Sequence, residues 1–333
     1  MKNEKATRRQ LLQSTALAAG AAALVTKPAA AQQPAAGAIE DVGLWKKLYP
    51  GFRNERIKTT GAGGAEINAV IGGSGPPLLL VHGAPDSLIT WRLIAADLAK
   101  EYTLVLMDLR GYGDSSKPEG EKDHSTYSKR PMALDGVEVM KHFGFNQFRM
   151  VGHDRGGRVG RRMAIDHPDK VQKLAVLDIV PAHYLYSHVT LEFVNGYYHW
   201  FSYLRPSPTP ENELKATNDA AAARATDEIQ REYARNRVKP EAIHAMCEDY
   251  RASASVDLKI DAADIKAGKK ITCPLLSLWA GRGLYPRLFD DVLGIWKQEG
   301  TNVNGKPIPN GTHNLQESAP KETLAEFQAF LKG

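Results

Sequence analysis

Short apolar runs recur along the chain, and segments with helical spacing separate them. The runs are rich in Val, Ile and Leu, which is typical of strands buried on both faces of a parallel sheet. Strands are predicted over 77–81, 103–109, 148–152, 174–180 and 274–280. Helices are predicted, from apolar residues at helical spacing, over 91–100, 132–143, 156–167, 288–298 and 321–332. The alternation indicates an α/β protein, a mostly parallel sheet with helices on both faces.

One long interval breaks this alternation. From residue 182 to about residue 268 no strand is predicted, and the interval opens with many aromatic side chains. Helical spacing then covers 219–237 and 240–252. An aromatic cluster of this size favours a covered surface over an ordinary solvent-facing helical excursion. The predicted division is a first core part at 40–181, an inserted helical cap at 182–270 and a second core part at 271–333.

The motif Gly152-His153-Asp154-Arg155-Gly156 lies between a predicted strand and a predicted helix. Gly-x-nucleophile-x-Gly in that context is the nucleophile elbow of the α/β-hydrolase fold, whereas a plain structural turn is the alternative interpretation. The central residue here is Asp rather than Ser. A carboxylate can displace a leaving group from a saturated carbon and form an aspartyl ester. This chemistry suits carbon–halogen bonds and epoxides better than ordinary esters.

An Asp nucleophile needs a base to activate water, and the base needs an acidic partner. The fold places them in the order nucleophile, acid, His, so we predict His313 as the base. Asp178 is predicted as the orienting acid because it lies within an apolar run, where an unpaired buried carboxylate would be costly. A surface His and a strand-end cap are the alternatives. The oxyanion hole is expected from the backbone N–H groups of Ala84 and Arg155.

The helix after the elbow begins with an unusual number of arginines. Arg155 and Arg158 are three residues apart, so they share one helix face beside Asp154. Their guanidiniums would keep Asp154 ionised and offer fork-shaped donors to a substrate carboxylate. A solvated helix face is the alternative. Arg161 and Arg162, one turn further on, are interpreted as solvated or ion-paired.

From near residue 75 to the C-terminus, the chain resembles the fluoroacetate (haloacetate) dehalogenases, which are related to the epoxide hydrolases. The matching stretches are His82-Gly83-x-Pro85 with Trp91, 108–115, 152–158, 177–181, 198–200 and 247–251. The resemblance implies Asp154 as nucleophile, His313 as base and Asp178 as its partner. It also implies that Arg155 and Arg158 hold the substrate carboxylate. His199, Trp200 and Tyr250 would donate hydrogen bonds to the departing halide, although aromatic packing is the alternative for the last two.

The chain also departs from the family pattern. No Trp follows Trp200 in the predicted cap, and Ala84 and Asp86 flank Pro85 in place of bulkier or amide residues. These differences put fluoride specificity in question and favour larger 2-halo acids as additional substrates. Two other functions remain open. An epoxide hydrolase would use the same Asp with cap tyrosines as acids, and a non-catalytic protein would only bind a small carboxylate.

The first residues of the chain predict a targeting signal rather than part of the folded protein. Arg8 and Arg9 precede a mild apolar stretch, and Ala29-Ala30-Ala31 provides a small-residue cleavage site. This order predicts a twin-arginine signal peptide over 1–31 and a periplasmic mature protein. An Ala-rich basic helix is the alternative.

Net charge, sequence motifs and cysteine content limit which binding partners, cofactors and disulfides are expected. Residues 1–31 carry +4 of the formal net charge of +5, so the rest lacks the basic face of a nucleic-acid-binding protein. We expect a small anionic substrate, no cofactor, no metal and no stable membrane insertion, because no cofactor motif or membrane-length apolar run occurs. A periplasmic location would permit a disulfide between Cys247 and Cys273, but two free thiols are favoured. The oligomeric state stays open, with a homodimer as one alternative.

Overall fold

The computed structural model describes residues 43–332, so the signal-peptide prediction for 1–31 falls outside the described residues. These residues form an eight-stranded sheet with the order β1-β2-β4-β3-β5-β6-β7-β8. The strands from β4 to β8 in this order pair in parallel, whereas β2 is antiparallel to both of its neighbours. The strands are β1 Arg53–Thr59, β2 Ala65–Gly73, β3 Pro77–Val81, β4 Thr103–Met107, β5 Phe148–His153, β6 Val171–Leu177, β7 Leu275–Ala280 and β8 Val303–Ile308. The predicted fold class, an α/β hydrolase, is confirmed.

Both faces of the sheet are covered because its central strands are apolar on both sides. Leu79 and Val81 of β3 belong to one buried cluster, which includes residues of α3, α4 and α13. Leu78 and Leu80 belong to a second cluster with residues of α2 and α15 on the other face. The core helices are α1 Leu44–Leu48, α2 Ala95–Leu98, α3 Lys129–His142, α4 Arg155–Asp166, α12 Tyr285–Leu288, α13 Val292–Lys297, α14 Leu315–Ser318 and α15 Pro320–Leu331, with 3-10 turns η1 Leu88–Trp91 and η2 Ser125–Tyr127.

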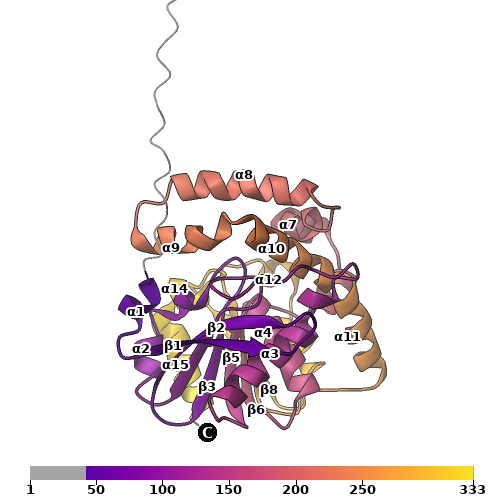
Figure 1. Ribbon diagram of the computed structural model, residues 1–333. Coiled ribbons are helices and arrows are strands. Elements are labelled where there is room, and N and C mark those ends of the chain that lie inside the picture. Colours follow the sequence, from indigo (N-terminus) through magenta and orange to yellow (C-terminus); the bar gives the residue numbers. More distant parts are fainter. Residues whose placement is uncertain (1–42, 333) are drawn as a thin grey trace, which may run out of the picture. The chain divides into compact units, whose positions relative to one another are not determined.

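A series of helices without a strand connects β6 to β7. These helices are α5 Ala182–Ser187, α6 Leu191–Gly196, α7 Tyr198–Ser202, α8 Thr209–Ala223, α9 Glu228–Arg237, α10 Pro240–Ser253 and α11 Val256–Lys266. Helices α8, α9 and α10 pack against one another and lie together with α7 beyond one end of the sheet (Figure 1). They fall within the interval 182–270 predicted as the cap, and we call α5–α11 the cap helices. The domain boundaries themselves stay a prediction.

Several predicted elements differ in detail from the structure. The strand predicted over 174–180 ends at Leu177, because Asp178 has a left-handed backbone conformation with φ 47°. The helix predicted over 91–100 is a 3-10 turn followed by the single turn α2, and the one predicted over 288–298 is divided between α12 and α13. The helix predicted over 219–237 is two helices, α8 and α9. Strands β1, β2 and β8 and helix α11 were not predicted.

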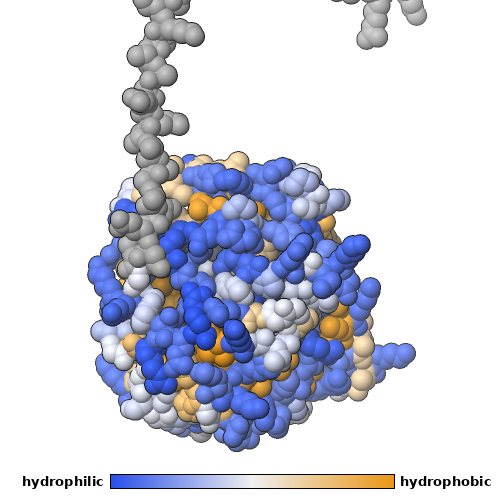
Figure 2. Space-filling view, viewed as in Figure 1, coloured by the Kyte–Doolittle hydropathy of each residue, from blue (hydrophilic) through white to orange (hydrophobic). Residues whose placement is uncertain are grey.

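Surface hydropathy, membrane-length helices and metal-binding clusters were searched in the described residues. The face in Figure 2 is mainly hydrophilic, with hydrophobic residues in separate patches. Within residues 43–332 no helix is both long and apolar enough to cross a bilayer. The same residues contain no cluster of three or more His, Cys, Asp or Glu side chains that could hold a metal ion. Cys247 and Cys273 are free thiols.

Candidate active site

Asp154 lies at the sharp turn between β5 and α4. Its backbone has φ 44°, an uncommon conformation for a residue other than glycine. The flanking glycines are required by close backbone contacts, because a Cβ on Gly152 would lie 2.4 Å from the Gly156 carbonyl oxygen. A Cβ on Gly156 would lie 2.3 Å from the Val81 carbonyl oxygen. The sequence therefore folds at this point so that the Asp154 side chain is presented beyond the carboxyl end of β5.

The loop after β3 approaches the Asp154 carboxylate closely. The backbone N–H of Ala84 donates a hydrogen bond to Asp154 Oδ2 at 3.1 Å, as expected for one donor of an oxyanion hole. A Cβ on Gly83 would lie 2.7 Å from the Asp154 Cβ, so only glycine allows this approach. The N–H of Arg155 begins α4 next to the same carboxylate, and its oxyanion role stays a prediction.

The charges around Asp154 favour its ionised form. Burial alone would raise the pKa of this carboxyl group, but the positive charges of His313, Arg155 and Arg158 outweigh it and hold the pKa well below its usual range. Asp154 is therefore an anion at neutral pH. A carboxylate can act as a nucleophile only in this form.

His313 and Asp178 lie together, in the arrangement of a base and its orienting acid. The Nδ1–H of His313 donates to Asp178 Oδ2 at 2.6 Å, and the other carboxylate oxygen accepts from the N–H of Ala280 at 2.8 Å. Burial lowers the pKa of His313, but the hydrogen bond to Asp178 and the negative charge of Asp154 outweigh it and raise this pKa to about 9. The imidazole is thus protonated at neutral pH while Asp154 carries its charge.

Two further residues hold the loop that carries His313, and no role was predicted for either of them. His153 Nε2 donates to the backbone carbonyl of His313 at 3.0 Å, with Gln316 Nε2 3.3 Å from the other ring nitrogen. Burial lowers the pKa of His153, which favours this neutral, one-donor form. Asp86 accepts from Asn314, the residue after the base, and pairs with Arg237 of α9 at 2.8 Å. His153 is part of the elbow motif. Its position next to Asp154 in the sequence was the only feature that could have suggested a role for it in the site.

Arg155 and Arg158 are buried, so the solvated alternative is wrong. Arg155 Nη1 donates to Ser253 Oγ at 2.7 Å, and Arg158 Nη1 donates to the Val180 carbonyl oxygen at 2.8 Å. The Nε and Nη2 atoms of both side chains are buried without a hydrogen-bond partner in the described part of the chain. Burying charged donors without hydrogen-bond partners is costly.

The cap helices bring the three predicted halide donors together. His199 and Trp200 lie on α7, and both rings contact Tyr250 of α10, with centroid distances of 5.6 and 5.8 Å. Tyr250 also covers the guanidinium of Arg155, 3.5 Å from its ring centroid. Burial and the charge of Arg155 lower the pKa of His199 to about 4, and burial raises that of Tyr250. Both are therefore neutral at pH 7 and keep a hydrogen to donate.

The next two basic residues of α4 join the core to the cap. Arg161 and Arg162 are buried, and both pair with Asp261 of α11. Arg161 also pairs with Glu299 at 2.7 Å. They are ion-paired, one of the two predicted alternatives, and they contribute no free donor to the site.

Comparisons with known proteins identify the family of this chain. Residues 76–239 match a family model described as the α/β-hydrolase fold. A fluoroacetate dehalogenase of Burkholderia is 40% identical over 296 residues, covering 85% of this chain and 95% of that protein. The chain belongs to the fluoroacetate dehalogenase family of the α/β hydrolases. A soluble epoxide hydrolase of Corynebacterium, 30% identical over 81% of this chain and 96% of its own length, shows the kinship with that second family.

Solved structures support the same fold. An α/β hydrolase of Nostoc has 44% sequence identity and a TM-score of 0.78, covering 84% of this chain and 98% of that one. A Pseudomonas aeruginosa structure described as an epoxide hydrolase has 37% identity and a TM-score of 0.76, covering 85% and 96%. The dehalogenase family and its epoxide-hydrolase relatives therefore share this architecture with the present chain.

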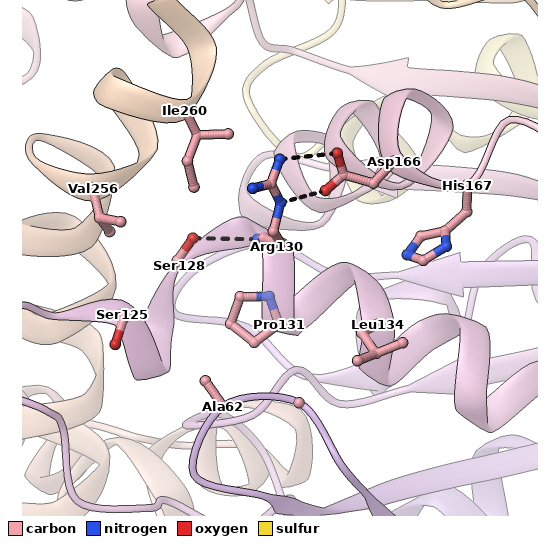
Figure 3. A pocket seen from close by; sticks show the side chains of 11 residues that line it. Ala62, Ser125, Ser128, Arg130, Pro131, Leu134, Asp166, His167, Val256 and Ile260 are labelled. Carbon is pink, nitrogen blue, oxygen red and sulfur yellow. Dashed lines mark hydrogen bonds and ion pairs between the residues drawn. The ribbon is translucent and has the colours of Figure 1, made fainter. Parts of the chain in front are cut away.

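A separate surface pocket lies away from the elbow of this dehalogenase-family chain. It has a volume of about 500 Å³ and lies between α3 and α11, lined by Pro131, Leu134, Val256 and Ile260 (Figure 3). Its Arg130 is paired with an aspartate of α4, 2.8 Å away. None of the predicted site residues lines this pocket, and its charges are already compensated. The elbow therefore stays the candidate active site.

Proposed function

We propose that this chain hydrolyses the carbon–halogen bond of haloacetates or small 2-halo acids, giving a 2-hydroxy acid and a halide. The observation that carries the proposal is the pair of buried guanidiniums with unpaired N–H groups directly beside Asp154. A small carboxylate is the anion that fits such fork-shaped donors. The kinship with a fluoroacetate dehalogenase supports the same reaction.

In the first step, the free N–H groups of Arg155 and Arg158 hold the substrate carboxylate. The α-carbon then faces Asp154, and a carboxylate oxygen of Asp154 bonds to it as the carbon–halogen bond breaks. The halide leaves with the bonding electron pair. His199, Trp200 and Tyr250 donate hydrogen bonds to the halide, which matters most for fluoride because it is a poor leaving group.

In the second step, water attacks the carbonyl carbon of the aspartyl ester. His313 takes the proton from this water, and Asp178 stabilises the imidazolium that forms. The Ala84 and Arg155 N–H groups stabilise the oxyanion of the tetrahedral intermediate. Its collapse releases the 2-hydroxy acid and regenerates the carboxylate, so one oxygen of water stays on Asp154.

The test follows from this path of oxygen. Halide release is first measured with fluoro-, chloro- and bromoacetate. A single turnover with excess enzyme in ¹⁸O-water should then give unlabelled glycolate and place the label on the Asp154 peptide. Label in the glycolate hydroxyl after one turnover would mean that water attacks the substrate directly, and the covalent mechanism would be rejected.

An epoxide hydrolase using the same nucleophile is the second candidate function. The relatives described as epoxide hydrolases favour it. The ring of Tyr250 lies against the Arg155 guanidinium, so its phenol is the candidate acid for the ring oxygen of an epoxide. The arginine pair is harder to explain for a neutral epoxide, because its N–H groups would stay unpaired. A diol assay on a simple epoxide, run beside the halide assay, distinguishes the two functions.

We further propose that the enzyme acts in the periplasm after twin-arginine export. The proposal rests on Arg8, Arg9 and the following apolar stretch. Cell fractionation should find the wild-type chain in the periplasm and the double variant Arg8→Lys, Arg9→Lys in the cytoplasm. Equal distribution of both would contradict export by this route. The oligomeric state is tested by light scattering, which distinguishes the homodimer alternative from a monomer.

A further inference from the structure

A buried carboxylate of the cap forms an ion pair with Arg155. Asp249 lies on α10 and has no exposed surface. Its Oδ1 forms an ion pair with Arg155 Nη1 at 3.6 Å and also accepts from Lys129, the first residue of α3. Its Oδ2 accepts from the hydroxyl of Tyr112 at 2.7 Å. Asp249 is therefore held by two core residues while it contacts a third.

The position of Arg155 depends on the balance between two carboxylates. Asp154 precedes it in the chain, and the negative charge of Asp154 attracts the same guanidinium that Asp249 contacts. An arginine paired with the nucleophile would cover the attacking oxygen and use the donors that the substrate needs. In the structure the guanidinium instead stacks on Tyr250 and bonds to Ser253, with Nε and Nη2 left unpaired.

We propose that Asp249 is a positioning residue that fixes the orientation of Arg155, with Lys129 and Tyr112 fixing Asp249 in turn. Asp249 keeps Arg155 away from the nucleophile and directs its free N–H groups to the substrate carboxylate. The three partners come from α3, α4 and the loop after β4, whereas Asp249 comes from a cap helix. Docking of α10 on the core therefore completes the carboxylate site. This inference rests on the proposed function, because it takes the guest to be a small carboxylate.

The test is Asp249→Asn in the full chain, with Glu248→Gln as the matched control. Glu248 precedes it on α10 and is also buried, but it pairs with Arg251 and His124. Asp249→Asn should raise the KM for chloroacetate and the Kd for propionate, an acid that cannot react, by at least about tenfold. Glu248→Gln should change neither by more than about twofold, because it lies outside the network that holds Arg155.

A double-mutant cycle shows whether the effect passes through Arg155. In an Arg155→Met background, Asp249→Asn should cause no further rise in either constant. An equally large rise in that background, or a folded Asp249→Asn with wild-type constants, would overturn the proposal. Circular dichroism checks folding. If Asp249→Asn does not fold, Tyr112→Phe and Ser253→Ala serve as replacements, because each removes a single hydrogen bond. Each should raise the Kd for propionate about threefold. An unchanged Kd in both variants would refute the proposed role of Asp249.

The experiments distinguish failure of the proposed function from failure of the proposed role of Asp249. A wild-type chain that binds propionate but releases no halide would refute the dehalogenase proposal, and the Kd series would still decide the role of Asp249. Turnover with no effect of Asp249→Asn would refute only the positioning role. A wild-type chain that neither turns over haloacetates nor binds propionate would overturn both.

Discussion

Formation of the aspartyl ester should itself convert His313 into a base. The pKa of His313 is raised to about 9, partly by the negative charge of Asp154. A group with a raised pKa stays protonated below that value, so His313 cannot accept a proton at neutral pH in the free enzyme. Esterification of Asp154 removes the charge, because an ester is neutral. The pKa of His313 should then fall towards neutrality at the moment when a base is needed.

The substitution Asp154→Asn imitates this loss of charge without changing the shape of the side chain. An opposite charge in contact with a titrating group shifts its pKa by about 1–3. The His313 side chain is 39% exposed, so solvent screening places the expected fall in the lower half of this range. Asp178 still contributes its hydrogen bond at 2.6 Å. We therefore expect a pKa of about 7–8 in the variant.

The assay is an NMR titration of the imidazole ¹⁵N signals, with His313→Gln to assign the resonance. Mass spectrometry verifies that the introduced amide remains intact. In the wild-type chain the same change should appear in the kinetics. The rate of ester hydrolysis should rise as the pH passes through about 7–8, whereas the rate of halide release in the first turnover should not show this rise. A His313 pKa that is the same in the wild-type chain and in Asp154→Asn would refute the reasoning.

Three other perturbations test separate parts of the account. His313→Ala should release one halide per active site and accumulate the aspartyl ester, seen by mass spectrometry, because loss of a general base slows hydrolysis by about 10²–10⁴; steady turnover would contradict it. Arg158→Lys keeps the charge but loses the fork geometry, so kcat/KM for chloroacetate should fall about 100-fold, and a change below fivefold would speak against a carboxylate clamp. Asp261→Asn breaks buried ion pairs with α4 and should lower the free energy of unfolding in urea by about 3 kcal/mol. Asp219→Asn, in an exposed pair with Lys215, should change it by about 0.5 kcal/mol or less, and equal effects would contradict the role of burial.

The sequence predicted the central strands well because their burial is complete. β3 is a continuous hydrophobic run, and β7 is interrupted only by Ser277, so the positions of both strands were clear. β8 lies at the edge of the sheet and alternates with exposed residues, including Lys306, so it has no such run. β1, at the opposite edge, also contains exposed residues and lacks a continuous hydrophobic run. The end of β6 depends on the left-handed conformation of Asp178, which a propensity for strand residues does not reveal.

Asp154 and Asp178 could be predicted because each lies at the end of a strand that the sequence indicated, whereas His313 was predicted from the order of catalytic residues along the chain. Parallel strands bring their carboxyl ends to one edge of the sheet, so Asp154 and Asp178 had to lie near each other. The contacts of Asp249 were not accessible in this way. They join a cap helix to residues more than 90 positions away in the chain, and they depend on how the cap docks. The family resemblance indicated that the stretch 247–251 matters. Only the structure shows which residues Asp249 contacts.

The two arginines of the site differ in how their charges are compensated, and this difference bears on selectivity. Arg155 has Asp249 as a partner, and a second cation, Lys129, shares that carboxylate. Within residues 43–332, Arg158 bonds to the Val180 carbonyl and makes no ion pair. Its guanidinium lies on Trp200, 4.7 Å from the ring centroid, where water is excluded. A buried cation that makes no ion pair is stabilised when an anion binds to it, so a carboxylate gains binding free energy at Arg158 that a neutral epoxide cannot gain. The preference for acids should therefore depend more on Arg158 than on Arg155.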